Sequence, residues 1–113
     1  MSPITTHILD VSKGRPAAGV AVQLEQQTPG GWKPLARAAT DDDGRVRDLL
    51  PDDAKLDVAV YRLVFDTGGY FERDGLSTFY LSVIIEFSIT APAEHHHVPL
   101  LLSPFGYTTY RGS

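Results

Sequence analysis

The chain has 113 residues, 42% of them hydrophobic, with a formal net charge of −4 and no cysteine. This length and apolar content predict one domain, residues 1–113, with a core that needs no cross-links. The lack of cysteine excludes disulfides, thiol catalysis and cysteine-bound metal. The acidic balance argues against a nucleic-acid partner. No apolar run approaches the roughly 20 residues that span a bilayer, and the amino terminus lacks a secretory signal pattern. We therefore expect a cytoplasmic protein with no membrane partner.

Short β-type runs separated by turn residues follow one another along the chain. In chain order, the expected strands are 4–11, 20–25, 32–38, 45–47, 58–65, 83–90, 96–103 and 107–111. Glycine, proline and aspartate clusters at 12–16, 29–31 and 41–44 mark turns between them, and residues 67–75 form a loop that could hold one or two helical turns. Seven or eight such strands predict an all-β sandwich of two stacked sheets.

Alternation along two of these strands places histidines on the same faces as apolar residues. Successive side chains of a strand point to opposite faces, so His7 shares a face with Leu9. On the penultimate strand His97 shares a face with Pro99, and His96 points the opposite way. A histidine among apolar neighbours on two separate strands indicates a partly desolvated polar site, although the pattern alone does not show that the two histidines meet.

Several residues near these strands could carry acid–base or anion chemistry. An imidazole titrates near neutral pH, at roughly 6.5, so His97 could act as a general acid or base. Arg45 leaves the turn at 41–44 and could clamp an anion or a planar amide. Tyr110 shares a strand face with Thr108, and Ser113 offers a hydroxyl and a terminal carboxylate. The alternative is that these groups are solvated turn and terminal residues.

A metal site is the competing interpretation of the same histidines. His7, His95 and His97 could form a three-histidine zinc site with an open position for water. Histidines two apart on a strand are common on surfaces, and no carboxylate is obviously placed to support a ligand, so we favour a site without metal. The aspartates at 41–43 lack the calcium-loop pattern, and no phosphate loop or cofactor fingerprint occurs. No cofactor is therefore expected.

Nearly the whole chain resembles the transthyretin-like family, and within it the 5-hydroxyisourate hydrolases. The similar segments are 6–10 (THILD), 14–17 (GRPA), 40–45 (TDDDGR), 61–65 (YRLVF), 69–71 (GYF) and 97–113 (HVPLLLSPFGYTTYRGS). The closing Tyr110-Arg111-Gly112-Ser113 matches the signature of the enzymes, which hormone-carrying transthyretins lack. Three residues depart from the family: His96 stands where a tyrosine is usual, and Leu81 and Ser82 stand where proline and glutamate are frequent.

The resemblance implies an eight-stranded sandwich with one short helix, assembled as a homotetramer (a dimer of dimers) with a central channel. It implies metal-free, cofactor-free hydrolysis of 5-hydroxyisourate to 2-oxo-4-hydroxy-4-carboxy-5-ureidoimidazoline in urate breakdown. By residue-by-residue correspondence, the implied catalytic residues are His7, Arg45 and His97, and the implied substrate-binding residues are Tyr110, Arg111, Gly112 and Ser113. The alternative from the same family is a small-ligand binding protein without turnover, against which the closing tetrapeptide argues.

Overall fold

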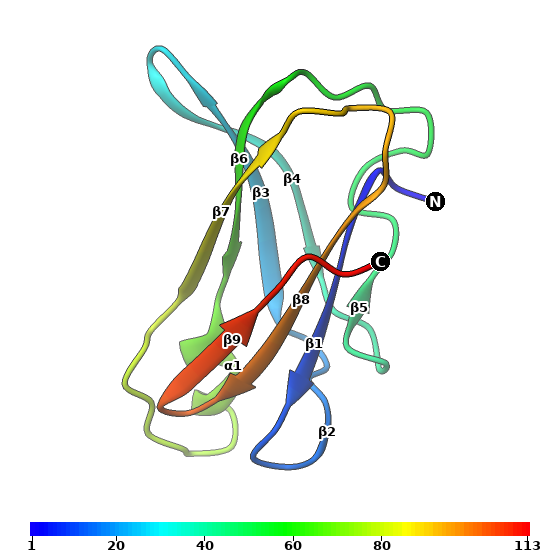
Figure 1. Cartoon of the computed structure of the whole chain (residues 1–113). Coiled ribbons are helices and arrows are strands. Elements are labelled where there is room, and N and C mark those ends of the chain that lie inside the picture. The colour runs from blue at the N-terminus through cyan, green and yellow to red at the C-terminus, as the bar shows by residue number, and fades with distance from the viewer.

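The computed structural model describes all 113 residues, which form nine strands and one short helix (Figure 1). The strands are β1 (Ile4–Asp10), β2 (Arg15–Pro16), β3 (Ala21–Thr28), β4 (Gly31–Ala39), β5 (Arg45–Val46), β6 (Ala59–Phe65), β7 (Val83–Ile89), β8 (His96–Ser103) and β9 (Gly106–Thr109). The helix, α1, spans Thr67–Glu72. No helix is long and apolar enough to cross a membrane.

Two sheets face each other across a common core, which confirms the predicted sandwich. One sheet has the order β2-β1-β8-β9 with β5 added to β1, and the other has the order β4-β3-β6-β7. Nineteen buried hydrophobic residues form a single cluster between them, among them Ile8, Leu24, Leu63 and Leu100. Fully burying such a side chain contributes about 1.5–3 kcal/mol, so the alternating apolar positions hold the two layers together.

The strand boundaries differ from the predicted ones by more than one residue at three places. β2 occupies two residues of the segment expected to be a turn, where Leu9 and Asp10 pair with Pro16 and Arg15. β3 continues to Thr28 because its polar end still pairs with β4. β9 ends at Thr109 instead of continuing to residue 111, and beyond it the chain keeps only an isolated antiparallel bridge to β8, between Gly112 and His97.

The strand register of the five-stranded sheet brings distant residues to one place. β1 pairs in parallel with β8, with Thr5 opposite His97, and pairs antiparallel with β5, with His7 opposite Arg45. Opposed residues point to the same face of a sheet. Ile8 lies on the core face and is fully buried, so Thr5, His7, Arg45 and His97 all lie on the outer face.

The turn before β5 directs Arg45 onto this face. Gly44 has a φ of +74°, and a Cβ there would lie 2.4 Å from the carbonyl oxygen of Ile8. A side chain is therefore excluded on both conformational and steric grounds. The Asp41 carboxylate accepts hydrogen bonds from the backbone N–H groups of Asp43 and Arg45, at 2.9 and 3.0 Å. These two bonds close the turn and fix the position at which β5 begins.

Candidate active site

A threonine hydroxyl joins two imidazoles on the outer face of the five-stranded sheet. Thr5 Oγ1 lies 2.8 Å from Nδ1 of His97 and 2.9 Å from Nε2 of His95. The two rings are nearly parallel, at 20°, with centroids 6.2 Å apart. His95 precedes β8 yet keeps the alternation of the strand, as expected, so it lies on the same face as His97.

The C-terminal segment covers one edge of the His97 ring. The Gly112 N–H donates to the His97 carbonyl oxygen at 2.9 Å, and Figure 1 shows the red segment crossing in front of β8 toward β1. A Cβ at Gly112 would lie 2.5 Å from Cδ2 of His97 and 3.1 Å from Cγ of Pro99. Only a residue without a side chain can therefore lie this close to the imidazole.

A small cavity opens between this segment and the start of β5. It has a volume of about 150 Å³ and is lined by Met1, Thr5, Thr6, Arg45, Arg47, His95, His97 and Ser113. Two guanidinium groups and two imidazoles face it, and no carboxylate side chain does. A planar molecule with carbonyl oxygens would meet donors on several sides here.

The surroundings of His97 favour its neutral form. Burial lowers the pKa of His97 below its ordinary value of 6.5, and the positive charges of His95, Arg45 and His7 lower it further. An imidazole that stays neutral at physiological pH keeps a lone pair for accepting a proton. His97 therefore has the electrostatic character of a general base, and Arg45 supplies a fixed positive charge beside it.

The structure brings together some of the predicted site residues and separates others. His97, Arg45 and Ser113 share the cavity, and His7 adjoins it as the ladder partner of Arg45. Tyr110 and Arg111 instead line a neighbouring, more apolar groove of about 260 Å³, which His97 also lines. The Arg111 guanidinium donates to the carboxylate of Glu94 at 3.0 Å, so this side chain holds the tail at its outer end.

That apolar groove lies between the edges of the two sheets, where Ile85 and Phe87 of β7 face Thr109 of β9. His96 also lines it and is buried, pointing away from the site as its position in the strand predicted. Burial lowers the pKa of His96, and the positive charge of Arg111 adds to the effect. Its Nδ1 has no hydrogen-bond partner, so His96 leaves one buried polar atom unpaired.

The zinc alternative lacks a ligand set. No group of three histidine or carboxylate side chains in the chain is arranged to hold a metal ion. One nitrogen of His95 and one of His97 are already engaged by the Thr5 hydroxyl.

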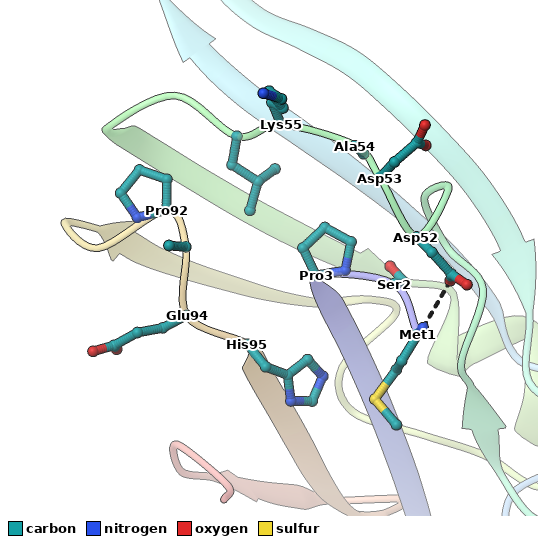
Figure 2. A pocket seen from close by; sticks show the side chains of 12 residues that line it. Met1, Ser2, Pro3, Asp52, Asp53, Ala54, Lys55, Pro92, Glu94 and His95 are labelled. Carbon is teal, nitrogen blue, oxygen red and sulfur yellow. Dashed lines mark ion pairs between the residues drawn. The ribbon is translucent and has the colours of Figure 1, made fainter.

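A larger cavity of about 550 Å³ adjoins the site, and Met1 and His95 line both (Figure 2). Its other walls come from the segments 2–3, 52–56 and 92–94. It contains neither Arg45 nor His97, so we assign the chemistry to the smaller cavity despite the difference in size.

Sequence reasoning did not single out Thr5. Its hydroxyl is central to the histidine pair, yet a threonine on a strand is ordinary in itself. Period-2 alternation does place Thr5 on the face of His7. Only the parallel pairing of β1 with β8, which joins residues about ninety positions apart, reveals that it meets His97.

The sequence and fold were compared with known proteins. The model of the HIUase/Transthyretin family matches residues 4–112. The chain belongs to this family. A 5-hydroxyisourate hydrolase of Salmonella dublin is 49% identical over 110 residues, covering 97% of this chain and 80% of that protein.

Solved structures of two kinds resemble the fold. The structure of Klebsiella pneumoniae 5-hydroxyisourate hydrolase has 37% identity and a TM-score of 0.85, covering 97% of this chain and 98% of that one. Transthyretin from Sparus aurata has 34% identity and a TM-score of 0.91, covering 99% and 97%. Because an enzyme and a transthyretin share the fold, the site has to decide between their functions.

Proposed function

We propose that the protein is an enzyme that hydrolyses 5-hydroxyisourate to 2-oxo-4-hydroxy-4-carboxy-5-ureidoimidazoline in urate degradation. The observation that carries the proposal is the small cavity, in which a neutral imidazole, His97, lies beside the Arg45 guanidinium under the C-terminal segment. Hydrolysis of a cyclic amide needs a base to activate water and a positive charge to stabilise the developing oxyanion. These two groups supply both without a metal or cofactor.

In this mechanism His97 accepts a proton from the attacking water and later returns it to the leaving ring nitrogen. Arg45 orients the planar substrate and stabilises the negative charge that develops on the carbonyl oxygen. His7 lies next to Arg45 in the ladder and helps to hold the water or the substrate. Positioning of this kind can supply a large part of the rate acceleration.

We assign substrate binding to the four residues of the tail acting as a unit. Ser113 lines the cavity, and Gly112 lies against the His97 ring. Tyr110 and Arg111 anchor the segment through the neighbouring groove and the ion pair with Glu94. The tail would thereby place its last residue where the substrate ring is held.

The second candidate function is a binding protein that holds a small ligand without turnover. The likeness to Sparus aurata transthyretin is the observation in its favour. It predicts saturable ligand binding with no change in the rate of substrate loss. The histidine and arginine side chains around the cavity favour the hydrolase, because a carrier has no need of a desolvated base beside a fixed cation.

We further propose that the single domain of residues 1–113 assembles as a homotetramer. Three apolar side chains, Phe79, Leu81 and Phe105, are each at least 70% exposed. The N–H of Phe79 donates to the Pro104 carbonyl at 2.9 Å, so the loop before β7 and the turn before β9 form one patch. Exposed apolar patches mark association surfaces. Sedimentation velocity should show a tetramer that Phe79→Glu dissociates.

The catalytic proposal is tested by following the ultraviolet absorbance of freshly generated 5-hydroxyisourate with and without the protein. Because the compound also decays spontaneously, the two rates have to be compared. His97→Ala should reduce turnover by about 10²–10⁴-fold with the fold intact. A folded His97→Ala protein with parental activity would contradict the assigned role.

The cytoplasmic location stays a prediction, which fractionation of the source cells would test.

A further inference from the structure

The position of Thr5 is not explained by the roles proposed so far. Its hydroxyl is within hydrogen-bond distance of both His95 and His97, and the residue is only 5% exposed. A hydroxyl carries one proton, so it can donate to one of these nitrogens while it accepts from the other. The three groups therefore form a directional chain with two possible proton arrangements.

Only one of these arrangements leaves His97 able to act as a base. If Nδ1 of His97 donates to Thr5, and Thr5 donates to Nε2 of His95, then Nε2 of His97 keeps its lone pair. No protein group hydrogen-bonds to that Nε2, which lies next to the ring carbon covered by Gly112. In the reverse arrangement Nε2 of His97 carries the proton and cannot accept one from water.

The charges around the two histidines differ. His97 is half-buried, with the positive charges of His95, Arg45 of β5 and His7 of β1 nearby, and Arg47 and Ser113 line the same cavity. A positive charge on His97 is therefore costly.

His95 is exposed and lines the larger cavity shown in Figure 2. Three carboxylates, Asp52, Asp53 and Glu94, line that cavity together with Lys55 and Met1. The terminal ammonium of Met1 pairs with Asp52, and Arg111 pairs with Glu94. The solvent around the exposed His95 accommodates a cation better than the half-buried surroundings of His97 do. The chain of hydrogen bonds thus runs from a site where a proton is costly to one where it is tolerated.

We propose that Thr5 and His95 form a proton relay that serves His97, an inference that rests on the proposed hydrolase function. As the water oxygen bonds to the substrate carbonyl carbon, one water proton passes to Nε2 of His97. The proton on Nδ1 moves to Thr5 Oγ1, and the hydroxyl proton moves to Nε2 of His95. The reverse transfer supplies the ring nitrogen with its proton as the C–N bond breaks. The second water proton is lost when the new carboxylic acid ionises.

Thr5 and His95 are positioning residues in this scheme, and three variants separate the relay from simple packing. Thr5→Val removes the hydroxyl at constant shape, and Thr5→Ser restores it. His95→Gln keeps a hydrogen-bonding side chain that cannot hold the proton. We expect Thr5→Val and His95→Gln each to lower kcat by about 10- to 100-fold, below the effect of losing the base itself. KM should stay within about threefold, and Thr5→Ser should recover kcat to within about threefold of the parent.

The double variant Thr5→Val with His95→Gln gives the sharpest result. Members of one relay act as a unit, so the double variant should be no slower than the slower single variant. Two independent structural effects would instead multiply. Multiplication of the two effects, or parental kcat in His95→Gln, would overturn the relay. His95 is exposed, so its variant keeps the test valid even if Thr5→Val fails to fold.

A measurement without turnover distinguishes failure of the relay from failure of the hydrolase proposal. Nitrogen-15 chemical shifts report which ring nitrogen of His97 carries the proton. We expect the Nδ1–H tautomer in the parent and loss of that preference in Thr5→Val. A parent with the Nε2–H tautomer would contradict the relay, whether or not the protein accelerates the loss of 5-hydroxyisourate. The expected tautomer with no acceleration would contradict the hydrolase proposal and the relay's catalytic role.

Discussion

Replacing Gly112 by alanine should disable the site through one added methyl group. The new Cβ would lie 2.5 Å from Cδ2 of His97, whereas ordinary contact begins at 3.4 Å, so ring and tail must separate by about 0.9 Å. Cγ of Pro99 would lie 3.1 Å from the same Cβ, which is also closer than ordinary contact. The φ of Gly112 is not positive, so alanine adds no backbone strain and the effect is steric.

A misplacement of about 1 Å at a catalytic group costs roughly 10²-fold in rate, which corresponds to about 2.7 kcal/mol of transition-state stabilisation. The loss of stability should be smaller, since at most the single hydrogen bond from Gly112 to the His97 carbonyl is weakened, worth about 0.5–1.5 kcal/mol. We therefore expect kcat/KM for 5-hydroxyisourate to fall about a hundredfold, with a nearly unchanged urea unfolding curve.

Gly30→Ala is the matched control. A Cβ there meets nothing within 4 Å, and Gly30 lies in the hairpin between β3 and β4, far from the tail in Figure 1. Both variants are assayed by ultraviolet decay of the substrate. If folded Gly112→Ala comes within about threefold of Gly30→Ala in kcat/KM, contact between tail and imidazole does not position the base.

Three further predictions concern pH, the tail and stability. Burial and neighbouring cations lower the pKa of His97 below 6.5. The value of kcat/KM should therefore stay constant as the pH falls to about 6.5 and decline only below that pH. A decline that begins above pH 7 would refute this prediction. Deleting residues 111–113 should abolish turnover. The unfolding free energy should change little, because the Arg111–Glu94 ion pair that is lost is exposed. An active truncated protein would show that the tail is dispensable. Tyr70→Phe should lower the free energy of urea unfolding by about 1.5–3 kcal/mol, since the Tyr70 hydroxyl donates to the buried Asp10 carboxylate at 2.8 Å. Unchanged stability would contradict a stabilising role for this hydrogen bond.

The Tyr70 hydroxyl also gives a prediction at alkaline pH. Burial, followed by the hydrogen bond to Asp10, raises the pKa of Tyr70 from 10.0 to about 12. Between these two values the unfolded chain ionises before the folded one, so stability is lost as pH rises through this window. Tyr70→Phe removes this contribution. The parent should therefore lose more stability than the variant over this range.

The sequence predicts the two layers of the fold better than it predicts which residues meet in the site. Alternation in segments such as 96–103 places Leu100 in the core and His97 outside it, and the structure has that strand at the predicted bounds. The strand register cannot be predicted from alternation, because pairing between segments far apart in the sequence decides the residue of β1 that lies opposite His97. Thr5 was missed for that reason. The end of β9 at Thr109 was also missed, because the residues that follow keep only the bridge between Gly112 and His97.

The most direct test of the account is the rate of 5-hydroxyisourate loss in the presence of the purified protein, measured beside folded His97→Gln. We predict that the parent accelerates the loss well beyond spontaneous decay, also in the presence of a chelator, and that the variant at equal concentration does not. A folded parent that leaves the spontaneous rate unchanged, or a variant that matches the parent, would contradict hydrolysis by His97 in the small cavity.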